Sequence, residues 1–131
     1  MARQSAMNGA ELRCTREFLG LTTDWLAAYL QVDKRRLERW ESDKLLPIPN
    51  AIVGAIDDLY AEAEEMVRNM TTVYSQLVKQ QDAEGIELLT YRTDRDLWSA
   101  RGASVMPARW HRMICARVCE RVPGLLLDYA A

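Results

Sequence analysis

The first third of the chain contains three short segments with apolar residues at helical spacing, and each follows a helix-start signal. Asn8 with Glu11 forms a capping-box pattern, and Thr22 and Asp33 stand at cap positions before the next two segments. Gly20 is placed to end the first segment in a left-handed conformation. The pattern predicts helices over roughly 9–19, 23–30 and 34–42.

The second and third of these helices are close enough in sequence to form a tight helix-turn-helix. Only Gln31, Val32 and Asp33 lie between them. Leu37 and Trp40 are expected to face inward with Leu12, Leu19, Leu26, Ala27, Leu30 and Val32.

A different pattern begins after Pro47 and Pro49. From Asn50 onward, apolar residues alternate steps of four and three along one face, which is typical of a long helix packed lengthwise against another. The stripe consists of Ile52, Ile56, Leu59, Ala63, Met66, Met70, Val73 and Leu77. Two alternatives remain for what packs against this stripe: a second copy of the chain, or the chain's own C-terminal helices.

The last third mixes one strand with two helices. Gly85 is expected to end the long helix, and residues 86–91 (IELLTY) form the one convincing strand, which needs a partner edge. Thr93 predicts a capped helix over roughly 94–101, and Pro107 predicts a last helix over roughly 107–121. The terminal LLLDYAA is expected to be an apolar tail.

Charge is distributed unevenly along the chain, although the formal net charge is only −2. Residues 1–46 carry eight Lys and Arg against seven Asp and Glu, residues 47–85 carry two against seven, and residues 86–131 carry seven against five. Nucleic-acid binding would therefore use a local patch rather than bulk basicity. Such a patch is offered by Lys34, Arg35, Arg36 and Arg39. The alternative is a solvated face paired with nearby acids such as Glu38.

Several classes of protein are disfavoured. No apolar run approaches the ~20 residues of a membrane span, and the N-terminus lacks the apolar core of a signal peptide. An odd number of cysteines also suits a reducing compartment, so a cytoplasmic location without membrane partners is expected. One His, no nucleophile elbow and no Gly-rich phosphate loop indicate no enzyme and no cofactor.

One metal site is worth weighing. His111, Cys115 and Cys119 follow one another at steps of four on one face of the last helix. A fourth ligand is not apparent, and the neighbouring apolar residues mark a packed face. The pattern favours buried cysteines over a metal site.

One run resembles the Cro/Xre-type helix-turn-helix: LGLTTDWLAAYLQVDKRRLERWE, residues 19–41. Cap, turn and core positions match over residues 8–50. One departure is Gln31, which stands where the motif commonly has Gly, in a turn position that tends to require a positive φ and where a side chain costs about 1–2 kcal/mol. More broadly, the chain is similar to the anti-CRISPR-associated transcriptional repressors and their bacterial relatives, through ELRCTR, RRLERWES, PIPN, IELLTY and ARWHRM. The resemblance implies a mainly α fold: a five-helix-type lambda-repressor-like helix-turn-helix domain whose long helix leads to a small α+β dimerisation region.

The domain organisation that follows is a flexible N-terminus (1–7), a DNA-binding domain (8–50), a long helix (51–84) and a dimerisation region (85–131). The resemblance implies a homodimeric, sequence-specific repressor that binds an inverted repeat in its own or a neighbouring promoter. Its partners would be double-stranded DNA and a second copy of itself. Some relatives also bind structured RNA.

Roles can be assigned to residues by the motif's register. Base contacts are expected from Lys34, Arg35, Arg39, Arg36 and Asp33, the last by accepting from cytosine N4. Phosphate contacts are expected from Thr22, Thr23, Ser42 and Lys44. Relatives tie the first helix to the third with a pair equivalent to Arg16 and Glu41, which is therefore read as structural.

Dimerisation is expected to use the long helix, the strand and the last helix, with the strand pairing with its mate across the two-fold axis. The residues are Leu59, Met66, Met70, Val73, Leu77, Ile86, Leu88 and Trp110. Two other classes of function remain open. One is an antitoxin-like adaptor that holds a cognate protein and uses DNA only to autoregulate, and the other is an RNA-binding regulator.

Overall fold

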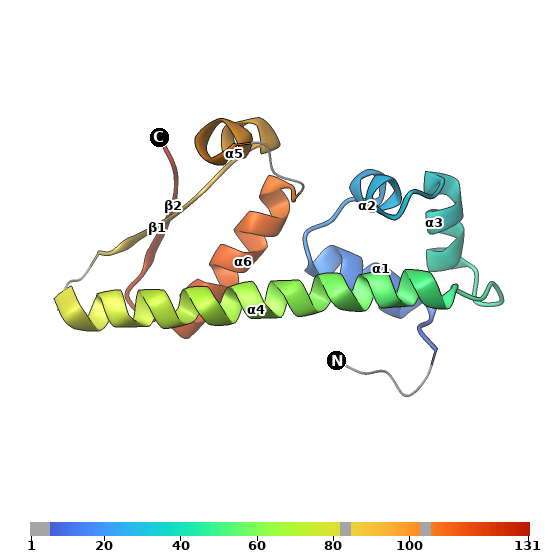
Figure 1. Ribbon diagram of the computed structural model, residues 1–131, viewed down its shortest axis with the longest axis horizontal. Coiled ribbons are helices and arrows are strands. Elements are labelled where there is room, and N and C mark those ends of the chain that lie inside the picture. Colours follow the sequence, from blue (N-terminus) through green and yellow to red (C-terminus); the bar gives the residue numbers. More distant parts are fainter. Residues whose placement is uncertain (1–5, 82–84, 103–105) are drawn as a thin grey trace. The chain divides into compact units, whose positions relative to one another are not determined.

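The described part of the chain is mainly helical, with one small sheet. The computed structural model describes residues 6–81, 85–102 and 106–131. This confirms the mainly α fold class, with a two-stranded sheet. Figure 1 shows the elements in chain order: α1 (Gly9–Phe18), α2 (Thr23–Leu30), α3 (Lys34–Ser42), α4 (Asn50–Gln81), β1 (Glu87–Thr90), α5 (Asp94–Arg101), α6 (Ala108–Arg121) and β2 (Leu126–Tyr129).

The chain divides into two compact units, and the boundary lies within α4. The first unit, Met1–Glu62, holds α1, α2, α3 and the start of α4, and the second, Ala63–Ala131, holds the remainder. Met7, which the sequence assigns to a flexible N-terminus, is buried. Parts of three predicted segments lie outside the described residues, namely 1–5, 82–84 and 103–105.

The side-chain caps predicted at Asn8 and Thr22 form in the first unit, whereas Asp33 stands at the cap position of α3 without a side-chain cap bond. The Asn8 side chain accepts from the Glu11 N–H at 2.8 Å, and the Glu11 carboxylate accepts from the Asn8 N–H at 3.0 Å. Thr22 Oγ1 accepts from the N–H of Trp25 at 3.1 Å. Gln31 has a φ of 57°, so the turn keeps its left-handed conformation despite the side chain. These local bonds fix where each helix begins and hence which face it buries.

The core of the first unit is built from apolar residues on one face of each short helix. Leu12, Leu19, Leu26 and Leu37 are fully buried, and Trp40 is nearly so. Leu30 and Val32 are half-buried, at the margin of this core. The inward orientation predicted for α3 is therefore observed.

α1 and α3 approach each other closely at Gly9. A Cβ atom at this position would lie 2.5 Å from the carbonyl oxygen of Trp40 and 2.7 Å from that of Glu41. These contacts are to backbone atoms, which cannot rotate away as a side chain would. Glycine is therefore required where the start of α1 meets the end of α3.

The second unit contains a parallel two-stranded sheet. β1 pairs with β2 in a register that joins Glu87 to Leu126 and Thr90 to Tyr129. The expected apolar tail is thus a strand, and β1 takes its partner edge from its own chain. The intervening α5 and α6 provide the long crossover that a parallel pair needs, which removes the reason for expecting β1 to pair with a second copy.

α6 packs against this sheet and provides a large part of the second unit's core. Trp110, Ile114 and Val118 are fully buried on α6, and Leu88 is buried on β1. The Arg117 guanidinium lies 2.6 Å from the Glu64 carboxylate and thereby joins α6 to α4 within this unit. The chain's own C-terminal helix is therefore in contact with α4.

The buried stripe of α4 departs from the predicted heptad. Ile56, Leu59 and Ala63 are buried as expected, but the next buried residue is Val67 rather than Met66, and Val73 is 53% exposed. A straight helix has 3.6 residues per turn, so a strict alternation of three and four drifts around its surface. Burial follows the straight helix and not a supercoiled seam.

Gly9→Ala should lower the free energy of unfolding by about 1–3 kcal/mol, because the new methyl group forces two backbones apart. Gly54→Ala is the matched control, since a Cβ atom there meets nothing within 4 Å inside α4. It should raise stability by about 0.5–1 kcal/mol through helix propensity. Urea denaturation followed by circular dichroism measures both changes. Equal effects of the two substitutions would contradict the close approach.

Candidate nucleic-acid interface

The exposed face of α3 is strongly basic. Leu37 and Trp40 are buried on its inner side, which leaves the other side of the helix to solvent. Four basic residues on α3 are exposed: Lys34, Arg35, Arg36 and Arg39. A helix that shows such a face beside a helix-turn-helix corner can enter a major groove and donate hydrogen bonds to base edges.

The three arginines lie together on one side of this face. A cleft of about 690 Å³ between α3 and the loop that follows it is lined by Asp33, Arg35, Arg36, Arg39, Trp40, Leu46, Pro47 and Pro49. The Arg36 guanidinium carbon lies 5.2 Å from the centroid of the Trp40 ring, which restrains its direction. Asp33 occupies the cap position of α3 but makes no side-chain cap bond there, so its carboxylate stays exposed beside the arginines.

Lys34 lies apart from the arginines, on the side of α3 that faces α2. Its Nζ is 3.1 Å from the Asp24 carboxylate, in the first turn of α2. The hydrogen bond to Asp24, helped by that residue's charge, raises the pKa of the Lys34 ammonium group. Lys34 lines a second cleft, of about 440 Å³, with Arg13, Arg16, Thr23, Glu38, Glu41 and Ser42. The expected base contacts are thus divided between two surfaces.

The expected phosphate donors differ in how free their hydroxyl protons are. Thr22 Oγ1 accepts a hydrogen bond as the cap of α2, which leaves its O–H proton available for a phosphate oxygen. Thr23 is half-buried beside Lys34. Ser42 donates its proton to the Glu38 carbonyl oxygen at 2.7 Å, so it must rotate before it can donate to a phosphate.

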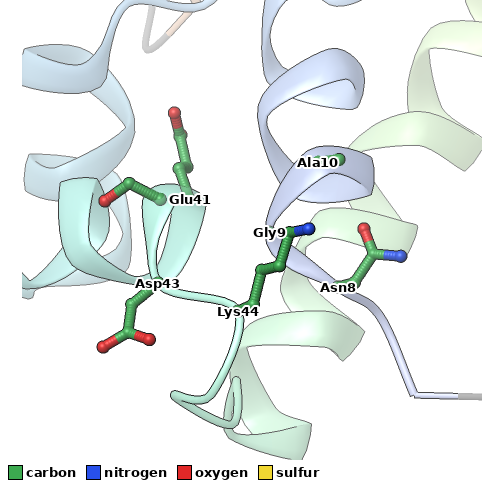
Figure 2. Close-up of a pocket in the computed structure, with 7 residues that line it drawn as sticks. Asn8, Gly9, Ala10, Glu41, Asp43 and Lys44 are labelled. Carbon is green, nitrogen blue, oxygen red and sulfur yellow. The ribbon is translucent and has the colours of Figure 1, made fainter.

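Lys44 lies on the loop after α3 and lines a third hollow, of about 370 Å³, with the start of α1. Figure 2 shows its side chain directed from the loop towards the first turn of α1, where Asn8, Gly9 and Ala10 lie. The side chain is exposed. A basic group at this flank of α3 suits contact with a polyanion backbone rather than with base edges.

Arg16 and Glu41 join α1 to α3 through a paired contact. Arg16 Nε lies 2.7 Å and Nη2 3.0 Å from the two carboxylate oxygens of Glu41, and Nη1 donates to the Leu21 carbonyl oxygen at 2.9 Å. The two side chains are only 11% and 7% exposed. The hydrogen bond to Glu41 is the main cause that raises the pKa of Arg16. Both groups are committed to each other, so Glu41 serves the scaffold and not a ligand.

The residues expected to form the dimer interface differ in how much of their side chain is exposed. Leu59, Leu88 and Trp110 are buried in the chain's own core, so they have no surface to offer a partner. Met66, Met70, Leu77 and Ile86 are half-buried, and Val73 is exposed. Sequence reasoning misses other exposed apolar side chains of the second unit, namely Leu89, Trp98, Leu126, Leu127 and Tyr129.

The cluster on α6 is packed inside the second unit. His111 Nδ1 lies 2.7 Å from Thr90 Oγ1 and 3.5 Å from Cys115 Sγ. Burial lowers the pKa of His111 to about 4 and raises that of Cys115 to about 11, so the imidazole is neutral and the thiol keeps its proton. No group of three or more His, Cys, Asp or Glu side chains suited to a metal occurs among the described residues.

None of the helices in the described part of the chain is long and apolar enough to span a membrane.

Two residues near the interface escape the sequence reasoning. Asp24 pairs with Lys34 across the turn, at a spacing that no helical repeat within one element reveals. Gly9 looks like an ordinary residue in a first helical turn, and only the three-dimensional crossing of α1 and α3 shows its importance. Both depend on how two helices meet.

Glu41→Ala should lower the free energy of unfolding by about 3 kcal/mol, because it leaves the Arg16 guanidinium largely buried without its partner. Glu17→Ala is the matched control. It breaks the pair with Arg13, whose side chains are 64% and 54% exposed, and should cost less than about 1 kcal/mol. Urea denaturation of both variants measures the difference. A Glu41 variant as stable as the Glu17 variant would show that the pair does not hold the scaffold.

Comparison with known proteins agrees with this geometry. No curated protein matches the chain. The model of the Aca2/YdiL-like family matches residues 7–122, from the buried Met7 to the end of α6. This span includes both the basic α3 and most of the second unit. The chain therefore belongs to the Aca2/YdiL-like family, an anti-CRISPR-associated family of non-enzymatic helix-turn-helix regulators that indicates a regulatory DNA-binding protein.

Proposed function

We propose that the protein is a sequence-specific transcriptional repressor. It binds an inverted-repeat operator as a homodimer and controls its own gene or a neighbouring operon. The observation that carries the proposal is the division of α3 into two faces. Leu37 and Trp40 anchor one face in the core, and the basic side chains stand on the other. A rigidly held basic helix is what direct readout of a major groove requires.

Arg35 and Arg39 are the proposed main readers of base edges. They lie one helical turn apart on the exposed face and line the same cleft. Each guanidinium can donate two hydrogen bonds to guanine O6 and N7, which favours a half-site that contains G·C pairs. Arg36 takes a base or a phosphate, and Asp33 accepts from cytosine N4. Lys34 donates to a guanine from the other side of α3.

Phosphate contacts frame this reading face. Thr22 and Thr23 donate at the start of α2, where the backbone N–H groups also favour an anion. Ser42 and Lys44 donate at the far end of α3. Such contacts set the register of the protein on the duplex without reading its sequence. We also propose a lambda-repressor-like relationship for the first unit. The resemblance implies five helices there, and the described residues of the unit form three short helices and the start of α4.

The homodimer is proposed to form through β2. The paired residues of β1 and β2 point to the same side of the sheet, so Leu89 and Leu126 share the face opposite the buried Leu88. Leu127 and Tyr129 expose apolar surface on the other face of the same strand. An apolar strand exposed on both faces favours association, and a two-fold axis would set the two α3 helices about 34 Å apart on the operator.

Arg35→Ala or Arg39→Ala should weaken binding to the preferred duplex by roughly 5- to 150-fold, equivalent to about 1–3 kcal/mol for a lost base contact. The duplex is one that the parent protein enriches from a random-sequence pool, and a gel shift measures affinity. Arg95→Ala, an exposed arginine on α5, is the matched control and should bind as the parent does. Unchanged affinity in both α3 variants would contradict the assignment of Arg35 and Arg39 as base contacts.

Lys44→Ala separates phosphate contact from base readout in the same assay. It should weaken binding to the enriched and scrambled duplexes by the same factor, and it should reduce the salt slope by about 1. A structured RNA of equal length, added as competitor, tests the alternative of an RNA-binding regulator. Stronger competition by the RNA than by the enriched duplex would favour that alternative.

Leu126→Glu should convert the homodimer to a monomer, because it places a charge on a β2 side chain that is 55% exposed. Light scattering coupled to size exclusion measures the mass. Leu45→Glu is the control, since Leu45 is 92% exposed in the loop after α3. A parent that is monomeric at micromolar concentration would contradict the homodimer, and a dimeric Leu126→Glu variant would contradict its placement on β2.

A further inference from the structure

An acidic side chain stands inside the proposed phosphate-binding flank. Asp24 lies in the first turn of α2, directly after Thr22 and Thr23, and its side chain is 78% exposed. Each phosphate that the threonines attract would repel this carboxylate. A DNA-binding face with no use for the residue would do better with a neutral one.

Asp24 holds Lys34 in place. Its carboxylate oxygen lies 3.1 Å from Nζ, and the pair bridges the start of α2 and the start of α3. Both partners are well exposed, so the pair contributes little to the stability of the fold. The charge of Asp24 also suits the positive end of the helix dipole at the start of α2. That benefit does not involve Lys34, whereas the ion pair gives the Lys34 side chain a fixed direction.

The other charged groups around Lys34 do not replace Asp24. Glu38 lies one turn further along α3 and affects Lys34 only weakly through its charge. Glu41 is committed to Arg16. The remaining charges in the cleft are those of Arg13 and Arg16, which repel the ammonium group. Asp24 is therefore the residue that restrains Lys34.

We propose that Asp24 is a specificity-determining residue that acts by positioning Lys34. The ammonium group has three N–H donors, so Lys34 can keep its bond to Asp24 and donate to a guanine at the same time. On a duplex without that guanine, Lys34 can gain only by moving to a phosphate, which leaves the carboxylate unpaired beside the backbone. Asp24 thus penalises wrong duplexes more than the right one. This inference rests on the proposed function.

A double-mutant cycle tests the inference with two duplexes, one enriched by the parent from a random pool and one scrambled from it. Asp24→Asn should strengthen binding to the scrambled duplex about 3- to 10-fold and strengthen binding to the enriched one less. The ratio of the two affinities should therefore fall by at least about 3-fold. In a Lys34→Met background, Asp24→Asn should change both affinities by the same factor. Thermal melting should show an unchanged fold in every variant.

Asp58→Asn is the matched control, because it removes the same charge from an exposed position on α4 of the same unit. It should leave the ratio of affinities unchanged. The inference is overturned if Asp24→Asn keeps the parent's ratio, or if the ratio falls equally without Lys34 or in Asp58→Asn. A parent that enriches no duplex would instead refute the proposed function, and the inference would fall with it.

Discussion

The contact between Arg16 and Glu41 determines how the basic face of α3 is held. One guanidinium binds both oxygens of a carboxylate on α3 and, with its remaining amine, the Leu21 carbonyl oxygen before α2. One side chain thereby joins α1, the segment before α2, and α3. The fork of an arginine fixes direction as well as distance, which a lysine ammonium would not do. The close approach at Gly9 completes this arrangement, because the two backbones can meet only where no side chain intervenes.

Much of the first unit could be predicted because its signals are local. Asn8, Thr22 and Gly20 act on neighbours within a few residues, so the sequence identifies the helix ends that the structure shows. The inward direction of Leu37 and Trp40 follows from helical period alone. The family relationship was equally accessible, because cap, turn and core residues fall at a recognisable spacing.

The errors arose where distant segments meet. β2 carries four exposed residues and no alternation of buried and exposed positions, so nothing in its sequence marks it as a strand until β1 is beside it. The burial along α4 follows a straight helix, so Val67 is buried where the heptad predicts Met66. Asp24 and Lys34 likewise meet only because the turn at Gln31 brings two helix starts together. The role proposed for this pair in binding therefore depends on the structure and not on the sequence pattern.

The parallel pairing of β1 with β2 also has a consequence for the order of folding. The contacts that hold the first unit together, such as that of Arg16 with Glu41, all lie within its own segment of the chain, whereas the sheet joins residues about forty positions apart near the other end (Figure 1). During synthesis, the short helices can therefore form while the second unit still lacks its final strand. Until β2 emerges from the ribosome, the edge of β1 that it will occupy stays open. The basic face of α3 can then be in place before the second unit is complete, so the arrival of β2 controls when the sheet closes.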